Sequence, residues 1–438
     1  MNANWKLLKN GLIVTINDSA DVDTGDILIE GKYIRGIGSN LKHSDAQYFD
    51  ASEYVIIPGL IQTHVHLCQT LFRNLADDLT LLNWLNKKIY PWEALHTPES
   101  LAISTKLGIA ELLLGGTSTI LDMGTVNHMD VVFEELARSG MRAFCGKTMM
   151  DKGEMPIALQ ENTSKAIDSS LTLLERWHNT GSERVKYAFA PRFILSCSKE
   201  LLTETVKLSR EYNVPLHTHA AENMTEVDIV KTMYNKDTIS FFEEIGAAGP
   251  NLCLAHCVWL NDREKDILRD TKIKVLHCPS SNLKLGSGIA PIPEYLDHGI
   301  TVSIGADGAP CNNNLDAFTE MRLAALIQKP KYGAHVMDSE SVLRMATIEG
   351  AKTLGLENEI GSIEVGKKAD LALIKLNQVH TIPYKSIYSK LVYSTPSSAV
   401  EHLIIDGEWV VKNRSLFNYD INDIMKQANY IANKLFIN

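Results

Sequence analysis

The stretch that decides the fold reads Pro58-Gly-Leu-Ile-Gln-Thr-His64-Val-His66 and follows the apolar run Tyr54-Val-Ile-Ile57. In an extended strand, residues i and i+2 point to the same face, so one strand end offers two imidazoles to the same small volume. Imidazole is a common neutral ligand of zinc and iron. For a lone His-x-His pair a structural role is the better interpretation. A metal site therefore requires further ligands at strand ends downstream.

Composition limits the class of protein. The chain has 438 residues, of which 22% are charged and 45% hydrophobic, as in ordinary globular proteins of one to three domains. A net charge of -10 without a basic cluster argues against nucleic-acid and membrane partners. No signal-peptide pattern or bilayer-spanning apolar stretch is visible. Seven cysteines without a Cys-x-x-Cys pair predict reduced thiols, and we expect a cytoplasmic protein.

Short apolar strands alternate with helical patterns from Pro58 onward. Repeated strand–helix units imply parallel strands with right-handed crossovers, and eight such units favour a closed (β/α)8 barrel, an α/β fold, over residues 58–358. The expected strands are the one ending at His64 and residues 119–123, 142–147, 185–190, 214–219, 252–256, 274–278 and 301–305.

Both ends of the chain read as β-structure. Short apolar runs separated by turn signals fill residues 1–57, and a similar pattern with a hairpin at 400–412 fills residues 359–438 before a helix at 421–435. Neither end has a core of its own. We therefore predict that the two ends pair into one small β-sandwich domain beside the barrel.

Metal-binding residue types recur at the predicted strand ends. In barrel enzymes the chemistry lies at the C-terminal ends of the strands. Imidazoles and a carboxylate can hold a divalent ion that activates water, and a nearby Glu can carry the proton. This pattern predicts hydrolysis at an electron-poor carbon. The residues at strand ends are His64, His66, His219, Glu222, His256 and Asp307.

The motif set resembles the amidohydrolase superfamily, in the branch that holds guanine deaminases, deaminases of adenosine derivatives and triazine hydrolases. The resemblance implies one divalent metal, zinc or alternatively iron, and no Lys ends the fourth strand to form a two-metal site. It assigns the metal to His64, His66, His219 and Asp307. The motifs that carry it are 58–66, His217-Thr-His-Ala-Ala-Glu-Asn223, Ala255-His-Cys257, His277-Cys-Pro-Ser-Ser-Asn-Leu-Lys-Leu285, Gly305-Ala-Asp-Gly-Ala309 and Gly366-Lys-Lys-Ala-Asp-Leu371.

The same resemblance assigns catalytic roles. Asp307 would accept a proton from the attacking water, His256 would stabilise the developing charge, and Glu222 would move a proton to the ring nitrogen. The exocyclic amine would leave as ammonia. A non-catalytic relative is the contrasting hypothesis, but no ligand position is missing.

Two subgroups compete for the substrate. Gln69, Arg192 and Phe193 match positions at which guanine deaminases read the base, although Arg192 could instead pair with a carboxylate and Gln69 could cap a helix. Trp84 and Glu93 match positions at which adenosylhomocysteine and methylthioadenosine deaminases stack on the base and bind the ribose.

A third match to the second subgroup is Arg142, which there reaches into a neighbouring subunit's site. The chain departs from that subgroup at Arg192, where a His is expected, and at Cys311, where a Ser is expected. No second Arg for an amino-acid tail is evident near 155–162. These departures make adenosylhomocysteine a poorer candidate than a shorter 5′-deoxyadenosine.

We therefore predict a deaminase acting on a small heterocycle, with a guanine-like cyclic acyl-guanidine as first substrate. Creatinine, pterin and ammeline belong to that class. The alternatives are an adenosine-type deaminase and a triazine chlorohydrolase. The cytidine-deaminase signature is absent, which argues against a nucleic-acid substrate. We expect a homo-oligomer, either a dimer or a tetramer.

Overall fold

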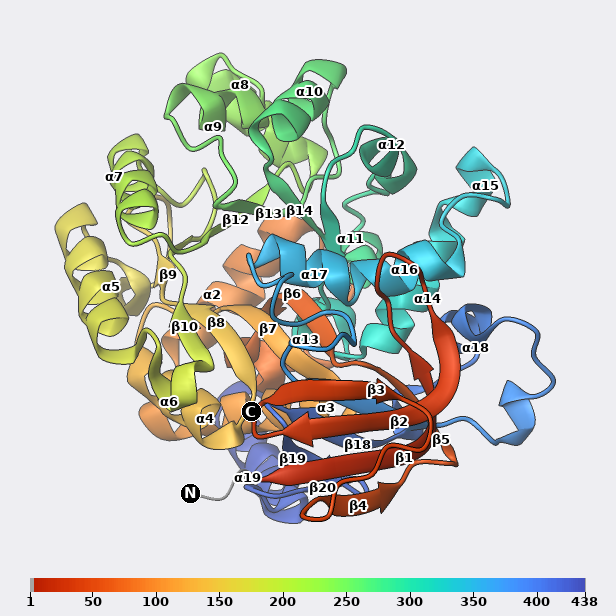
Figure 1. Ribbon diagram of the computed structural model, residues 1–438. Helices are drawn as coiled ribbons and strands as arrows, with labels where there is room; N and C mark the ends of the chain where they lie inside the picture. The colour runs from red at the N-terminus through yellow and green to blue at the C-terminus, as the bar shows by residue number, and fades with distance from the viewer. Residues whose placement is uncertain (1–3, 438) are drawn as a thin grey trace.

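The strand that carries His64 and His66 is β6 (Leu60–His66), which lies near the middle of the molecule in the computed structural model (Figure 1). The structure describes residues 4–437. Every residue of β6 is buried. The strand pairs in parallel with β7 (Thr117–Met123) on one side and with β16 (Asp307–Gly308) on the other. Both flanking strands therefore lie beside the two histidines.

The remaining barrel strands are also parallel to their neighbours, as the alternating pattern predicted. Two short pieces, β9 (Thr148–Met149) and β11 (Ala190–Pro191), continue the third and fourth strands and pair with each other. The strands of this group are β8 (Arg142–Gly146), β10 (Val185–Tyr187), β12 (Leu216–Ala220), β13 (Leu252–His256), β14 (Lys274–His277) and β15 (Val302–Ile304).

Two joints complete the ring. Phe189, just after β10, forms a parallel bridge to Leu216 in β12. On the other side the eighth strand is divided, because β15 pairs with β14 whereas β16 pairs with β6. Gly305 lies between these two pieces, and a Cβ atom there would come within 2.6 Å of the carbonyl oxygen of His64. Glycine at this position lets Asp307 follow directly beside the histidines.

Helices surround the barrel (Figure 1). One of them is α3 (Pro98–Leu114), and a capping box between Thr97 and Ser100 closes its first turn. The larger outer helices are α4 (Met129–Ser139), α5 (Thr163–Trp177), α7 (Lys199–Glu211), α8 (Met224–Tyr234), α9 (Thr238–Glu244), α10 (Asp262–Thr271), α12 (Ile292–Asp297), α14 (Ala317–Ile327), α16 (Ser339–Met345) and α17 (Ile348–Thr353).

Further helices lie in the loops and at the C-terminal end. Pro279 starts one of them directly after β14, since proline suits the first helical turn. The helix predicted at 421–435 is α19, followed by a π-helical turn at Asn433–Ile437. The elements of this group are α1 (Leu81–Trp84), α2 (Tyr90–Ala94), α6 (Thr180–Glu183), α11 (Pro279–Lys284), α13 (Ala309–Asn312), α15 (Lys329–Tyr332), α18 (Ile387–Tyr393) and α19 (Ile421–Ala432).

Strands from both ends of the chain form one nine-stranded sheet, drawn in red and blue at the bottom of Figure 1. Within this sheet, β5 pairs with β1 along one of its edges and with β17 along the other. Apolar side chains from both ends, among them Ile27, Ile56 and Leu371, pack into a shared core. The strands are β1 (Trp5–Val14), β2 (Val22–Glu30), β3 (Tyr33–Gly38), β4 (Gln47–Asp50), β5 (Tyr54–Pro58), β17 (Leu371–Lys375), β18 (Val400–Ile405), β19 (Glu408–Lys412) and β20 (Ser415–Leu416).

The apolar run at 54–57 and the two histidines belong to different sheets. The sequence suggested one strand that leads into His64, but the run forms β5 of the outer sheet and β6 starts afresh at Leu60. Gly59 lies at the crossing between the two strands, and its N–H donates to the carbonyl of Asp370.

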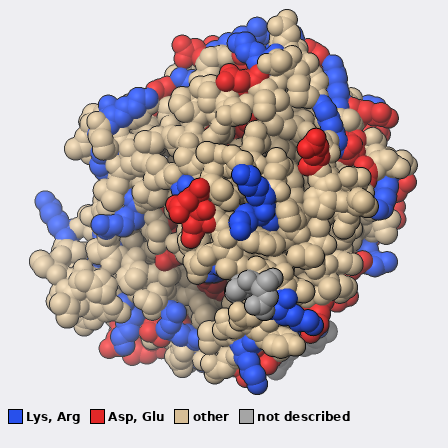
Figure 2. Space-filling model, turned by 180° about the vertical axis from the view of Figure 1, so that it is seen from behind, with Lys and Arg blue, Asp and Glu red and all other residues tan. Residues whose placement is uncertain are grey.

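The surface carries mixed charge. On the face seen in Figure 2, Lys and Arg side chains are interspersed with Asp and Glu side chains on a largely neutral background. Within residues 4–437, no helix is long and apolar enough to cross a membrane.

Candidate active site

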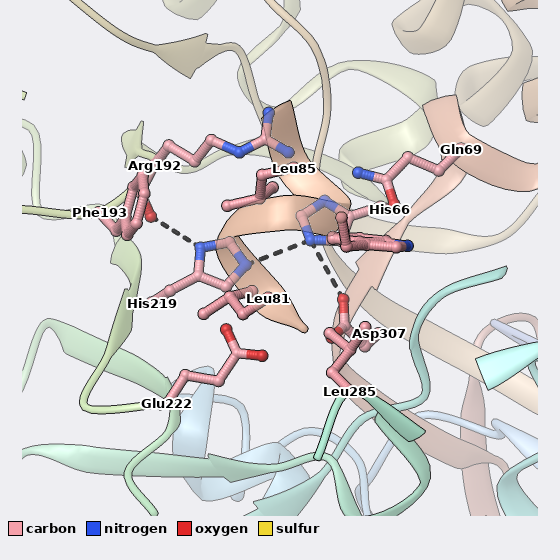
Figure 3. A pocket seen from close by; sticks show the side chains of 11 residues that line it. His66, Gln69, Leu81, Leu85, Arg192, Phe193, His219, Glu222, Leu285 and Asp307 are labelled. Carbon is pink, nitrogen blue, oxygen red and sulfur yellow. Dashed lines mark hydrogen bonds and ion pairs between the residues drawn. The ribbon is translucent and has the colours of Figure 1, made fainter. Parts of the chain in front are cut away.

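Four side chains from the barrel strands β6, β12 and β16 converge on one point. His64 and His66 end β6, His219 lies in β12 and Asp307 begins β16. One donor atom from each lies within 4.8 Å of those of the other three. Oδ1 of Asp307 is 3.3 Å from Nε2 of both His64 and His66. Figure 3 shows three of them pointing toward one another.

The second ring nitrogen of each histidine is held by a neighbour. These contacts orient each ring so that its Nε2 faces the common centre, an arrangement typical of metal-bound imidazoles. Each contact is 2.7 Å long, and they join His64 Nδ1 to His217 Nε2, His66 Nδ1 to the Met123 carbonyl, and His219 Nδ1 to the Arg192 carbonyl.

This donor set fits a divalent metal. Nε2 of His64 is buried and has no hydrogen-bond partner among the described residues. Burial alone would raise the pKa of Asp307, but the facing imidazoles of His64 and His66 outweigh it and lower that pKa well below its usual value. Three imidazoles and one carboxylate form a ligand set that suits zinc. The four predicted ligands therefore lie together as the sequence suggested.

A histidine and a carboxyl group flank the cluster. Nε2 of His256, at the end of β13, lies 3.4 Å from Oε2 of Glu222 and 3.9 Å from Oδ2 of Asp307. Its Nδ1 contacts Oδ1 of Asn282 at 2.8 Å, which fixes the ring. Burial and the nearby charge of Asp307 raise the pKa of Glu222 to about 8, so this carboxyl group can hold a proton near neutral pH.

A cavity opens beside the cluster (Figure 3). Four of the five residues predicted to bind substrate line it: Gln69, Trp84, Arg192 and Phe193. The rest of its wall combines three leucines with four polar residues. The remaining lining residues are His66, Leu81, Leu85, His219, Glu222, Leu285 and Asp307.

Glu93, the fifth predicted substrate ligand, is not among the lining residues. Its side chain is 0% exposed and forms a two-pronged ion pair with Arg192, at 2.8 and 3.2 Å. It also accepts a 2.9 Å hydrogen bond from Nε2 of Gln69. Its buried carboxylate thus contacts two of the residues that line the cavity, Gln69 and Arg192, and its own contact with substrate stays a prediction.

Arg142 does not extend toward another subunit. It begins β8, is buried, and pairs within its own chain with Asp370 at 3.0 Å and Asp406 at 2.5 Å. The two carboxylates lie next to the outer-sheet strands β17 and β18, so Arg142 links the barrel to that sheet.

Sequence reasoning missed the residues that hold the catalytic groups. Ser281 donates to Asp307, Asn282 holds His256, and Ser287 donates to Glu222 at 3.3 Å. The motif at 277–285 was quoted for the resemblance, and its polar residues just after a strand end were the available signal. His277 in the same motif is buried, and both of its ring nitrogens lack a partner among the described residues.

Together, the barrel, the four-donor cluster and the adjoining carboxyl group of Glu222 define a metal-dependent hydrolase. The model of the amidohydrolase family matches residues 55–410, and the chain belongs to this family. The predicted enzyme class, a hydrolase of carbon–nitrogen bonds in cyclic amidines that acts as a deaminase, is confirmed.

Similar proteins span almost the whole chain. A protein named 5′-deoxyadenosine deaminase from Methanobrevibacter smithii is 38% identical, covering 98% of this chain and 97% of its own. A 5-methylthioadenosine/S-adenosylhomocysteine deaminase from Syntrophobacter fumaroxidans is 37% identical, covering 97% of each chain. A solved adenosine deaminase from Xanthomonas campestris with bound zinc superposes with a TM-score of 0.93 at 29% identity, covering 99% and 98%. These names favour the adenosine-type alternative over the guanine-like substrate that we predicted first.

Proposed function

We propose that this protein deaminates an adenosine-derived nucleoside with a short, uncharged 5′ end, and that 5′-deoxyadenosine is its best substrate. The main support for this proposal is the charge of the cavity wall. Arg192 is the one Lys or Arg among the described residues that line the cavity, and Glu93 already neutralises it. An amino-acid tail, as in adenosylhomocysteine, would find no free cation for its carboxylate. A methyl group suits the apolar Leu81, Leu85 and Leu285.

The guanine-like substrate fits less well. It requires Arg192 to donate to a ring carbonyl, and Glu93 already takes one N–H from each terminal nitrogen of Arg192, which leaves three of its five N–H groups. The relative named 5′-deoxyadenosine deaminase, which covers nearly the full chain, supports the adenosine type. Guanine stays in the test panel because Gln69 and Arg192 both line the cavity.

We propose zinc as the metal, held by His64, His66, His219 and Asp307, with iron as the alternative. The zinc in the similar Xanthomonas campestris structure supports this choice. When bound, the metal would lower the pKa of a coordinated water to roughly 7 and so supply hydroxide at neutral pH.

The chain's own residues would move the protons. Asp307 takes a proton from the attacking water, and His256 stabilises the negative charge that develops on the incoming oxygen. Glu222, whose carboxyl group can carry a proton near neutral pH, delivers one to the ring nitrogen next to the attacked carbon. Asp307 then passes its proton to the exocyclic amine, the carbon–nitrogen bond breaks, and the proton of the new hydroxyl returns to Glu222. Water and the aminopurine become the oxopurine and ammonia.

The predicted dimer or tetramer and the cytoplasmic location are part of the same proposal. All seven cysteines are buried and none forms a disulfide, which suits a reducing compartment. The family resemblance is the support for the oligomer.

The test is ammonia release from a panel of 5′-deoxyadenosine, methylthioadenosine, adenosylhomocysteine, adenosine and guanine, using zinc-loaded enzyme. We expect the highest kcat/KM with 5′-deoxyadenosine. Adenosylhomocysteine should be poorer through a higher KM, since its tail lacks a partner. If guanine is the only compound that releases ammonia, the proposal is wrong and the guanine-like substrate class is correct.

A further inference from the structure

A second buried carboxyl group lies behind Glu222, the proposed proton carrier. Glu226 stands four residues further along, in the first turn of α8, and its side chain is 0% exposed. Its Oε2 accepts a 2.8 Å hydrogen bond from the backbone N–H of Glu222. Its Oε1 is buried and has no hydrogen-bond partner among the described residues. A buried oxygen left unpaired costs free energy, and the proposed mechanism gives Glu226 no role that would explain this cost.

The contact differs from an ordinary helix cap. In a capping box, the glutamate at the third helical position accepts from the backbone N–H of the cap residue itself. Helix α10 has this arrangement, because Glu264 accepts from the N–H of its cap residue Asn261 at 3.0 Å. In α8 the cap residue is Asn223, but Glu226 bonds to the N–H of the residue before it. The residue that Glu226 holds is therefore Glu222 and not the cap.

Glu222 follows a strained turn between β12 and α8. Ala221, directly before it, has a φ of +50°, and a non-glycine residue keeps this left-handed conformation only where neighbouring contacts hold it. The Ala221 carbonyl accepts from the N–H groups of Val258 and Trp259, just after β13. On the other side of the turn, Glu226 supplies the contact to the N–H of Glu222. Loss of that contact would release the backbone that carries Glu222.

The carboxyl group of Glu222 has two close neighbours, so its position matters. Its Oε1 accepts from the Ser287 hydroxyl at 3.3 Å, and its Oε2 lies 3.4 Å from Nε2 of His256. Ser287 thus holds this residue at the tip of its side chain, whereas Glu226 holds it at the backbone. Misplacement of a reacting group on the order of 1 Å can lower a rate by about 100-fold.

We infer that Glu226 is a positioning residue for proton transfer: it fixes the backbone of Glu222 so that the carboxyl group of Glu222 reaches the ring nitrogen of the substrate. Glu226 itself is not among the residues that line the cavity. Its accepting oxygen matters more than its charge, since burial and the nearby Glu222 raise the pKa of Glu226 to about 7. The inference rests on the proposed role of Glu222, but not on which nucleoside is the substrate.

Two substitutions test it in zinc-loaded enzyme, with the compound of the panel that has the highest kcat/KM. Glu226→Gln keeps an oxygen for the N–H of Glu222, and its kcat should stay near the wild-type value. Glu226→Met keeps the length of the side chain but lacks that oxygen. Its kcat should fall about 10- to 100-fold, while KM and the zinc content stay at the wild-type values.

Combination with Glu222→Gln separates positioning from packing. If Glu226 acts through Glu222, adding Glu226→Met to Glu222→Gln should lower kcat no further, because the proton carrier is already lost. Glu264→Met is the matched control, since it removes the buried glutamate at the same position of α10. Its kcat per folded molecule should equal that of the wild type.

The outcomes separate the two levels of proposal. Wild-type kcat in Glu226→Met, with Glu222→Gln inactive, overturns the inference alone. An equal loss from Glu226→Met with and without Glu222→Gln also overturns it, since packing would explain that result. So does a loss in Glu226→Gln as large as in Glu226→Met, because the retained oxygen would then have no effect. Wild-type kcat in Glu222→Gln overturns the proposed proton path and the inference together.

A measurement on the wild type covers the case in which Glu226→Met does not fold. Hydrogen exchange of the Glu222 amide reports directly on the contact with Glu226. Slow exchange in both the wild type and Glu226→Gln supports the inference, and exchange at the rate of a free amide overturns it.

Discussion

Ser281 donates a 2.6 Å hydrogen bond from its hydroxyl to Oδ2 of Asp307. This leaves Oδ1 as the carboxylate oxygen nearest His64 and His66, at 3.3 Å from each Nε2. A residue of α11, which contributes no ligand of its own, thus decides which oxygen of Asp307 faces the cluster.

Removing that hydroxyl should weaken metal binding. In Ser281→Ala the carboxylate keeps only the 2.7 Å hydrogen bond from the N–H of Gly308 to Oδ1, and loss of such supporting contacts typically lowers metal affinity roughly 10- to 100-fold. Zinc titration of the metal-free protein against a competing chelator measures it. Ser280→Ala is the control, because its hydroxyl donates to Glu320 instead. Wild-type affinity in Ser281→Ala would show that the hydrogen bond does not orient Asp307.

Glu222→Gln should separate metal binding from turnover. Glu222 carries no metal ligand atom, so elemental analysis should find as much zinc as in the wild type. The amide cannot deliver the proton, and kcat should fall by about 10²- to 10⁴-fold. The exposed Glu243→Gln is a control for loss of one negative charge. Wild-type kcat in Glu222→Gln would remove this residue from the proton path.

His96 should make stability depend on pH. Burial lowers its pKa to about 4, whereas an unfolded chain has the ordinary value of 6.5. As pH falls below 6.5 the unfolded state gains the proton first, so stability is lost down to pH 4 and is complete above 6.5. At pH 5 this amounts to about 2 kcal/mol.

The measurement is urea unfolding of the metal-free protein at pH 7 and pH 5. In His96→Gln the loss between the two pH values should be smaller by that amount. The ring contacts the Ser100 hydroxyl and the Cys68 carbonyl, so loss of these contacts lowers the stability of the variant equally at both pH values and leaves the difference unaffected. An identical pH dependence in both proteins contradicts the prediction.

Arg142→Ala should destabilise the fold rather than alter the chemistry. It would leave Asp370 and Asp406 buried without a cation, which costs about 3–5 kcal/mol. Chemical denaturation measures the loss, and kcat per folded molecule should stay at the wild-type value. Arg138→Ala removes an exposed guanidinium from the buried Glu135, which keeps its pair with Lys106, and should cost about 1 kcal/mol or less. A specific loss of activity in Arg142→Ala with unchanged stability would instead support a role in a neighbouring site.

The metal cluster could be predicted because its geometry follows from local rules. Period-two alternation puts His64 and His66 on one face of a strand. Parallel strands in a barrel bring His219 and Asp307 to the same end, however far apart they lie in the chain.

The supporting contacts follow no such rule. The pair formed by Glu93 and Arg192 joins residues 99 positions apart, and its geometry depends on how the segment at 81–94 packs over the barrel. Arg142 shows the same limit: its position matched a subgroup, but two carboxylates from the outer sheet decide its partner. The apolar run that forms β5 was equally ambiguous, since the sequence of an apolar strand does not indicate which sheet the strand joins.

The place of β5 between β1 and β17 has a consequence for how the protein is made. During synthesis, β5 emerges from the ribosome more than 300 residues before the strand that covers its second edge. Until Leu371–Lys375 is translated, that edge stays open and can pair with another nascent chain. Contacts of such long sequence separation also slow folding. A chain that stops before β17 would therefore be prone to aggregate although it carries every metal ligand.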